Sequence, residues 1–234
     1  MFWKTFLLAA VCCLLPLSGS PAAARSLSVE IITDSGQPCP VYPVGSRDGS
    51  RRAYVEARLN ARYGIRITNH TGRRLGLVVA VDGRNIISGN RSHLSSSERM
   101  YVLDPYSEAV YDGWRTSRDY VSRFYFTSAG DSYAGAWDDY SAMGVIAVAA
   151  YAERRLSAPF YDDAPRRRSY SRPGTGFGEK NYSPTVRTEF WPESKPLARH
   201  FLKYEWRETL CRKNVIACQP QSENRFWDDE DFWH

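Results

Sequence analysis

Hydrophobic residues recur at every second position in several short segments, a period typical of half-buried β-strands. Arg62–Thr68 reads Arg-Tyr-Gly-Ile-Arg-Ile-Thr, and Tyr120–Phe126 reads Tyr-Val-Ser-Arg-Phe-Tyr-Phe. Leu75–Val81 and Gly144–Tyr151 are almost continuously apolar, as expected of buried strands. Asp82-Gly83 follows one of these runs and predicts a hairpin turn, because this dipeptide adopts positive φ with little strain. A binding loop is the alternative for that segment.

The same pattern predicts shorter strands elsewhere in the chain. They are Leu27–Ile32, Ala53–Leu59, Met100–Leu103, Glu108–Tyr111, Gly113–Arg115, Thr185–Trp191 and Leu202–Trp206. Helical signals are limited to about one turn each at Ser132–Trp137 and Glu208–Lys213. Aromatic residues make up 14% of the chain, with 16 Gly and 13 Pro, which also favours β structure.

These patterns predict a mainly β protein, an antiparallel β-sandwich with a long basic loop and a small C-terminal extension. With 234 residues, the chain can bury one substantial core but has little room for a second domain. We divide it into a signal peptide (1–24), an N-terminal polar segment (25–52), a β-sandwich core (53–152), a basic Pro/Arg-rich loop (153–183), returning strands with a cysteine-closed segment (184–218) and an acidic aromatic tail (219–234).

The first 24 residues have the organisation of a secretory signal peptide. Lys4 is their only charged residue, Phe6–Leu15 is apolar, and Ala22–Ala24 supplies small residues for cleavage. A signal anchor or a buried helix is the alternative, and a lipid anchor at Cys12 is disfavoured because Val11 precedes it. Cleavage after Ala24 removes only Lys4 among charged residues and lowers the net charge from +5 to +4. We therefore expect an exported protein, periplasmic or secreted, without a transmembrane span in the mature chain.

Three cysteines remain after that cleavage, and export would place them in an oxidising compartment. Cys211 and Cys218 enclose six residues, so a disulfide between them would close a small C-terminal loop. Pairing through Cys39 is the competing possibility. The spacing fits neither a zinc ribbon nor a Cys-x-x-Cys redox pair.

A series of segments between residues 54 and 210 resembles a family of uncharacterised exported proteins of Gram-negative bacteria. They are Val78–Gly89 (Val-Val-Ala-Val-Asp-Gly-Arg-Asn-Ile-Ile-Ser-Gly), Tyr101–Pro105, Gly113-Trp114-Arg115, Phe124–Phe126, Asp131–Ala134, Gly144–Val148 and Gly174–Gly178. The resemblance implies export and a β-sandwich-like fold. It assigns no reaction and no catalytic residue.

Candidate catalytic residues are few. Gly130–Ala134 approaches the nucleophile-elbow pattern, and Ser132 could combine with Asp162 or Asp163 and His200 as a triad. That elbow requires a strand–turn–helix in an α/β sheet, so a turn between strands is the favoured interpretation.

No cofactor or metal is expected. Gly174–Gly178 resembles a phosphate-binding loop, but no Gly-Lys-Ser/Thr follows it, and a flexible lead-in to a strand is favoured. The four histidines lack the spacing of a transition-metal site.

Candidate binding residues are aromatic or basic. Trp114 with Arg115 could form an exposed sugar-stacking or anion site, although a strand Trp is more often part of a core. The other candidates are Arg166, Arg167 and Arg168 in the basic loop and Trp227 and Trp233 in the tail. The modest charge and the expected export argue against nucleic acid as a partner.

We therefore predict an exported, non-enzymatic binding or structural protein of the bacterial envelope that recognises a protein or glycan surface. A secreted serine-type hydrolase using Ser132 and His200 is the alternative.

Overall fold

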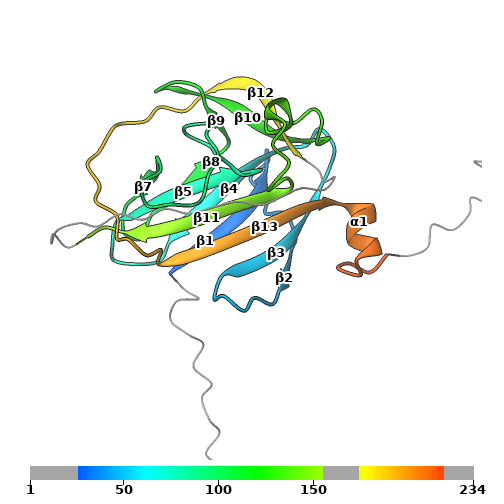
Figure 1. The fold of residues 1–234 in the computed structure, drawn as a ribbon, viewed down its shortest axis with the longest axis horizontal. Coiled ribbons are helices and arrows are strands. Elements are labelled where there is room, and N and C mark those ends of the chain that lie inside the picture. Colours follow the sequence, from blue (N-terminus) through cyan, green and yellow to red (C-terminus); the bar gives the residue numbers. More distant parts are fainter. Residues whose placement is uncertain (1–25, 155–173, 219–234) are drawn as a thin grey trace, which may run out of the picture.

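The computed structural model describes residues 26–154 and 174–218, and these residues form two packed β-sheets (Figure 1). Sheet A has the order β1-β4-β10-β12, with β8 beside β4 and β9 beside β10. Its strands are β1 (Leu27–Thr33), β4 (Arg62–Asn69), β8 (Glu108–Tyr111), β9 (Gly113–Arg115), β10 (Tyr120–Thr127) and β12 (Gly174–Tyr182).

Sheet B has the order β2-β3-β13-β11-β5-β6, with β7 beside β5. Its strands are β2 (Val41–Val44), β3 (Arg51–Ala57), β13 (Ala198–Trp206), β11 (Val145–Ala152), β5 (Leu75–Val81), β6 (Arg84–Asn85) and β7 (Tyr101–Leu103). A 3-10 turn, η2 (Gly135–Trp137), precedes β11, and helix α1 (Arg207–Arg212) follows β13.

The mainly β, sandwich-like fold predicted from the sequence is confirmed. One strand pair departs from the expected antiparallel arrangement, because β13 runs parallel to β3. A long stretch of chain rather than a tight hairpin separates these two strands, so nothing in their connection imposes an antiparallel direction.

The core lies between the inward faces of the two sheets. Ile65 and Ile67 of sheet A and Val79, Val81 and Val148 of sheet B are among its buried residues. β5 is buried at every position, since a second small cluster, including Leu94 and Met100, covers its outer face at Val78. Burial on both faces explains why this strand reads as a continuous apolar run.

The hairpin predicted at Asp82-Gly83 is confirmed. Val81 pairs with Arg84, and the two residues between them have φ of 49° and 80°. Positive φ at both central positions is the backbone condition of a type I′ turn, which Asp-Gly satisfies readily.

The strand predicted at Thr185–Trp191 is wrong. The segment has no sheet ladder, and its backbone makes isolated bonds such as Thr185 N to Arg118 O at 3.1 Å. Pro184 and Pro192 flank it and cannot donate to a ladder.

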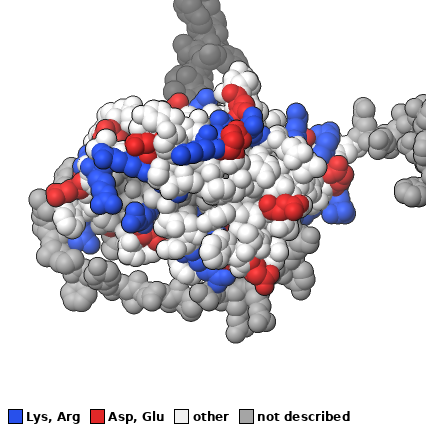
Figure 2. All heavy atoms as spheres, turned by 90° about the horizontal axis from the view of Figure 1, so that it is seen from above, with Lys and Arg blue, Asp and Glu red and all other residues white. Residues whose placement is uncertain are grey.

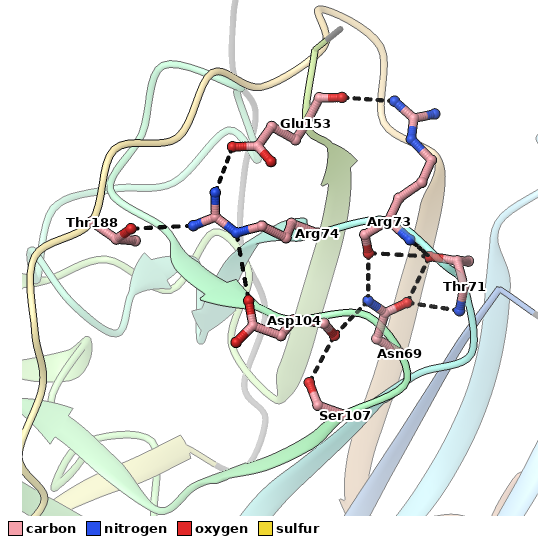
Figure 3. A network of polar contacts seen from close by, with 8 residues as sticks. All are labelled: Asn69, Thr71, Arg73, Arg74, Asp104, Ser107, Glu153 and Thr188. Carbon is pink, nitrogen blue, oxygen red and sulfur yellow. Dashed lines mark hydrogen bonds and ion pairs between the residues drawn. The ribbon is translucent and has the colours of Figure 1, made fainter.

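Side chains hold this segment against the sandwich (Figure 3). The Arg74 guanidinium reaches Thr188 Oγ1 at 3.2 Å, Glu153 Oε1 at 2.7 Å and Asp104 at 3.5 Å. The Asn69 amide beside it donates to the carbonyls of Arg73 and Asp104, and Thr71 donates to Asn69. This network is structural, because its members bind one another across several elements.

Two further strands lie in segments predicted as loops. β2 falls in the N-terminal polar segment, and β12 occupies the end of the predicted 153–183 loop. Gly176 of β12 pairs with Tyr125, and a Cβ at Gly176 would lie 2.1 Å from the Tyr125 ring. The glycine therefore serves close packing in a strand, not a phosphate-binding loop.

Candidate functional site

A buried carboxylate links the two sheets. Asp82 has no solvent exposure, and its Oδ1 accepts from Gly144 N at 2.7 Å and from the Tyr204 hydroxyl at 2.6 Å. Its Oδ2 accepts from Thr175 N at 2.6 Å. The Thr175 hydroxyl in turn lies 2.8 Å from the Tyr204 oxygen and 2.7 Å from the Tyr63 oxygen.

These bonds have a direction when Asp82 is ionised, because a carboxylate only accepts hydrogen bonds. Tyr204 must donate to Asp82, so Thr175 donates to Tyr204 and Tyr63 donates to Thr175. We call these four residues the relay. It joins Tyr63 and Thr175 of sheet A to Asp82 and Tyr204 of sheet B.

Burial controls the electrostatics of the relay. It raises the pKa of Asp82 to about 6, although the four hydrogen-bond contacts from Tyr204, Thr175, Gly144 and Val145 oppose the shift. Burial also raises the pKa of the Tyr63 and Tyr204 phenols well above the ordinary value. The relay is closed to solvent, so its role is structural. It positions the starts of two strands, because Gly144 directly precedes β11 and Thr175 lies at the start of β12.

Close to the start of β12, three aromatic rings form a surface that we call the aromatic shelf: Tyr133, Trp137 and Phe177. The Tyr133 ring stacks on Phe177 at 5.3 Å and meets Trp137 edge-on at 6.5 Å. Trp137 is 61% exposed and Phe177 46% exposed. The buried Trp114 ring lies 4.6 Å from Tyr133 and so forms the floor of the shelf.

The shelf is fixed by short local contacts. Tyr133 N donates to Thr175 O at 2.9 Å, which ties the loop before η2 to β12 and thereby to the relay. A Cβ at Gly174 would lie 2.4 Å from the Ser132 Cβ, so only glycine allows this approach. The Trp114 indole donates to Gly176 O at 3.2 Å and anchors the floor to the same strand.

A guanidinium lies beside the shelf. Arg84 is 5.1 Å from the centroid of the Trp137 ring, and its Nη2 is 3.8 Å from Asp139. Burial alone would raise the pKa of Asp139, but hydrogen bonds from Arg91 and Ser141 lower it. Arg91 binds both Asp139 oxygens at 2.7 Å, so a buried anion holds two arginines close to Trp137.

The expectation of an exposed ring at Trp114 is corrected. Its indole is buried against Phe124 and Tyr133, because strand β9 turns it toward the core. Arg115 donates to the Tyr101 hydroxyl at 3.0 Å and to Ser183, so its guanidinium fastens the chain after β12. Trp114 is therefore a core residue, the alternative given for a tryptophan on a strand, and Arg115 has a structural role.

Ser132 and His200 do not form a catalytic pair in the described part of the chain. The Ser132 hydroxyl is buried, donates to Ala129 O at 2.7 Å and accepts from Gly135 N at 3.0 Å. His200 lies in β13 opposite Val148 and Arg51, and no hydrogen bond joins it to Ser132. Burial, aided by Arg51, lowers the pKa of His200 to about 4. Asp162 and Asp163 lie outside the described residues.

We expect Ser132 not to react with a fluorophosphonate probe. Its side chain is 2% exposed and its proton is bound to the Ala129 carbonyl. The measurement is labelling of the folded protein, with Ser132→Ala and an active serine hydrolase as controls. Labelling of the wild type that disappears in Ser132→Ala would contradict this expectation.

The Cys211–Cys218 disulfide is confirmed, with a Cα–Cα distance of 5.6 Å. Cys39 is a free, half-buried thiol, so the alternative pairing through it is wrong. Within residues 26–154 and 174–218, no helix is long and apolar enough to cross a membrane. The same ranges contain no group of three or more side chains arranged to hold a metal ion.

The remaining predicted binding residues, Arg166, Arg167, Arg168, Trp227 and Trp233, lie outside the described residues. The three residues of the shelf were not predicted from the sequence. The available signal was the spacing of Tyr133 and Trp137, four residues apart in a segment with a helical period. Nothing in the sequence brings Phe177 to them.

Comparison with family models, curated proteins and solved structures found no match. The resemblance to exported Gram-negative proteins therefore stays a prediction, and the site is interpreted from its own geometry.

Proposed function

We propose that this chain is an exported, non-enzymatic binding or structural protein of the bacterial envelope that receives a protein or glycan surface on the aromatic shelf. The observation that carries the proposal is Trp137, an indole that is 61% exposed yet held beside Tyr133 and Arg84. Trp, Tyr and Arg are the residues most enriched where binding energy concentrates in interfaces.

The support is energetic as well as compositional. Leaving large aromatic surface in water is unfavourable, and covering it with a ligand recovers that free energy. Tyr133 is bound to Thr175 through its backbone and rests on Trp114, so the shelf loses little conformational freedom when a ligand arrives.

The surface charges favour the same class of partner over nucleic acid. Figure 2 shows basic and acidic side chains interspersed on the face that it presents. A surface that binds phosphate backbones concentrates Lys and Arg and excludes carboxylates. Mixed charge is compatible with a protein or glycan surface.

The test is affinity capture of residues 25–234 from the cell's own envelope, in the wild type and in Trp137→Ala. We expect Trp137→Ala to reduce the amount of captured partner at least about tenfold, as loss of a central aromatic contact does. Trp191→Ala is the matched control, because Trp191 is 58% exposed but makes no ring contact with the shelf.

Equal capture by wild type, Trp137→Ala and Trp191→Ala would overturn the role of the shelf. Loss in both variants would do the same, since it would show no preference for the shelf indole. Mass spectrometry and glycan staining of the captured material then distinguish a protein partner from a glycan.

A further inference from the structure

A shallow depression lies on the outer face of sheet A. It has a volume of about 480 Å³ and is open to solvent, and we call it the cavity. Its lining residues come from both edges of the sheet and from its centre: Asp34, Asn60, Arg62, Tyr125, Gly178 and Glu179. None of them belongs to the aromatic shelf.

Four of the six lining residues lie in strands of sheet A, and Asp34 and Asn60 lie in turns beside it. Tyr125 of β10 lies across Gly176 of β12, where any side chain would meet its ring. Asn60 lines the cavity and has a backbone φ of 63°, a conformation that Asn tolerates better than most residues. Its backbone N is fixed to Phe126 O at 2.9 Å.

Charges of opposite sign alternate around the cavity. Arg62 Nε binds Glu179 at 2.9 Å, and Arg62 Nη1 lies 3.8 Å from Asp34. Asp34 also pairs with Arg123, whose other nitrogen lies 3.6 Å from Asp112. An anion in the cavity would meet two carboxylates, and a cation would meet the arginines.

Neutral hydroxyl groups suit this lining better than either ion. A hydroxyl both donates and accepts, so neighbouring hydroxyls can donate to Asp34 or Glu179 while accepting from Arg62 or Asn60. The Arg62, Asp34 and Glu179 side chains line the cavity and are each about half exposed, so part of their hydrogen-bonding capacity is accessible to a ligand. Tyr125 adds an aromatic wall for apolar C–H groups.

We propose that this cavity binds one or two units of a neutral saccharide. Sugars combine vicinal hydroxyls with apolar C–H faces, which matches a lining of paired carboxylates, a guanidinium, an amide and one phenol ring. This inference goes beyond the proposed function, because it concerns a separate site and would stand even if the shelf bound nothing.

The test is saturation-transfer NMR on residues 25–234 with uncharged sugars. The probes are glucose, galactose, mannose, N-acetylglucosamine, maltose, lactose, cellobiose and diacetylchitobiose, with inorganic phosphate as the charged comparison. We expect at least one sugar to bind with a Kd below about 10 mM, and phosphate not to bind.

The variant Glu179→Ala should weaken that binding at least about tenfold, because it removes a charged hydrogen-bond acceptor. The matched control is Glu30→Ala. Glu30 pairs with Arg66 at 3.2 Å on the same sheet and is 48% exposed, against 51% for Glu179, but it does not line the cavity. Sugar binding should be unchanged in Glu30→Ala.

Three results would overturn the inference. They are no binding by any of these sugars, equal binding by wild type and Glu179→Ala, or binding of phosphate at this site in place of sugar. Including Trp137→Ala separates the two proposals. Sugar binding lost in Trp137→Ala but kept in Glu179→Ala would place the sugar on the shelf and reject the cavity.

Discussion

Replacing Asp82 with alanine is expected to lower the free energy of unfolding by about 3–5 kcal/mol at pH 7.5. The change leaves the Gly144 and Thr175 amides and the Tyr204 hydroxyl without their buried acceptor. It also puts alanine at a φ of 49°, where aspartate is better tolerated. Urea denaturation followed by tryptophan fluorescence measures the loss.

Asp34→Ala is the control for this variant. Its carboxylate also pairs with arginine but is about half exposed, so we expect a change within about 1 kcal/mol. A loss at Asp82 no larger than the loss at Asp34 would show that the relay does not stabilise the protein.

Asp82→Asn isolates the charge, since asparagine keeps the shape and suits the turn. The folded pKa of Asp82, about 6, lies above its ordinary 3.8. The folded state therefore binds a proton that the unfolded state lacks between about pH 4 and 6, and this contribution to stability falls as pH rises through that interval.

His200 acts in the opposite sense, because its folded pKa of about 4 lies below the ordinary 6.5. Its contribution to stability rises with pH over the same range. The difference between wild type and Asp82→Asn cancels the effect of His200. We expect that difference to become less favourable to the wild type as pH rises from 4 to 6, and a pH-independent difference would contradict the raised pKa.

Trp114→Ala is expected to lower the free energy of unfolding by about 3–5 kcal/mol. The indole contacts Phe124 and Tyr133 and donates to Gly176 O, so its removal opens a cavity and loses that hydrogen bond. Thermal and urea denaturation measure the effect. The change also removes the floor of the shelf.

Trp137→Ala provides the contrast within the same cluster. Because its ring is largely exposed, we expect its stability to change by less than about 1 kcal/mol while partner capture falls. Similar stability losses in the two tryptophan variants would show that Trp137 is part of the core and would weaken the assignment of the shelf as a binding surface.

The strands that the sequence predicted well are those whose local pattern agrees with their burial. Leu75–Val81 and Glu108–Tyr111 have the predicted boundaries. β12 could not be predicted in this way, because Gly174, Gly176 and Gly178 lower strand propensity. These glycines allow Ser132, Tyr125 and Arg123 to approach the backbone of β12 closely, and these contacts can be identified only from the fold.

The site was less predictable than the fold. The turn at Asp82-Gly83 follows from local chemistry, but the Asp82 carboxylate meets Thr175 and Tyr204 across 93 and 122 residues of sequence. Phe177 reaches Tyr133 in the same long-range way. Among the described residues, Trp114 was the tryptophan singled out from the sequence, but strand β9 places it in the core. The exposed indole of the shelf belongs to Trp137, which lies in the η2 turn outside both sheets.

The position of β13 has a consequence for the order in which the protein can be made. Among the residues that the structure describes, β13 is the last strand in sequence order, yet it lies between β3 and β11 and pairs His200 with Arg51. A nascent chain that stops before Ala198 leaves the facing edges of β3 and β11 open, and open edges recruit other strands. Folding of sheet B therefore waits until β13 has been synthesised, and products truncated before it are expected to aggregate.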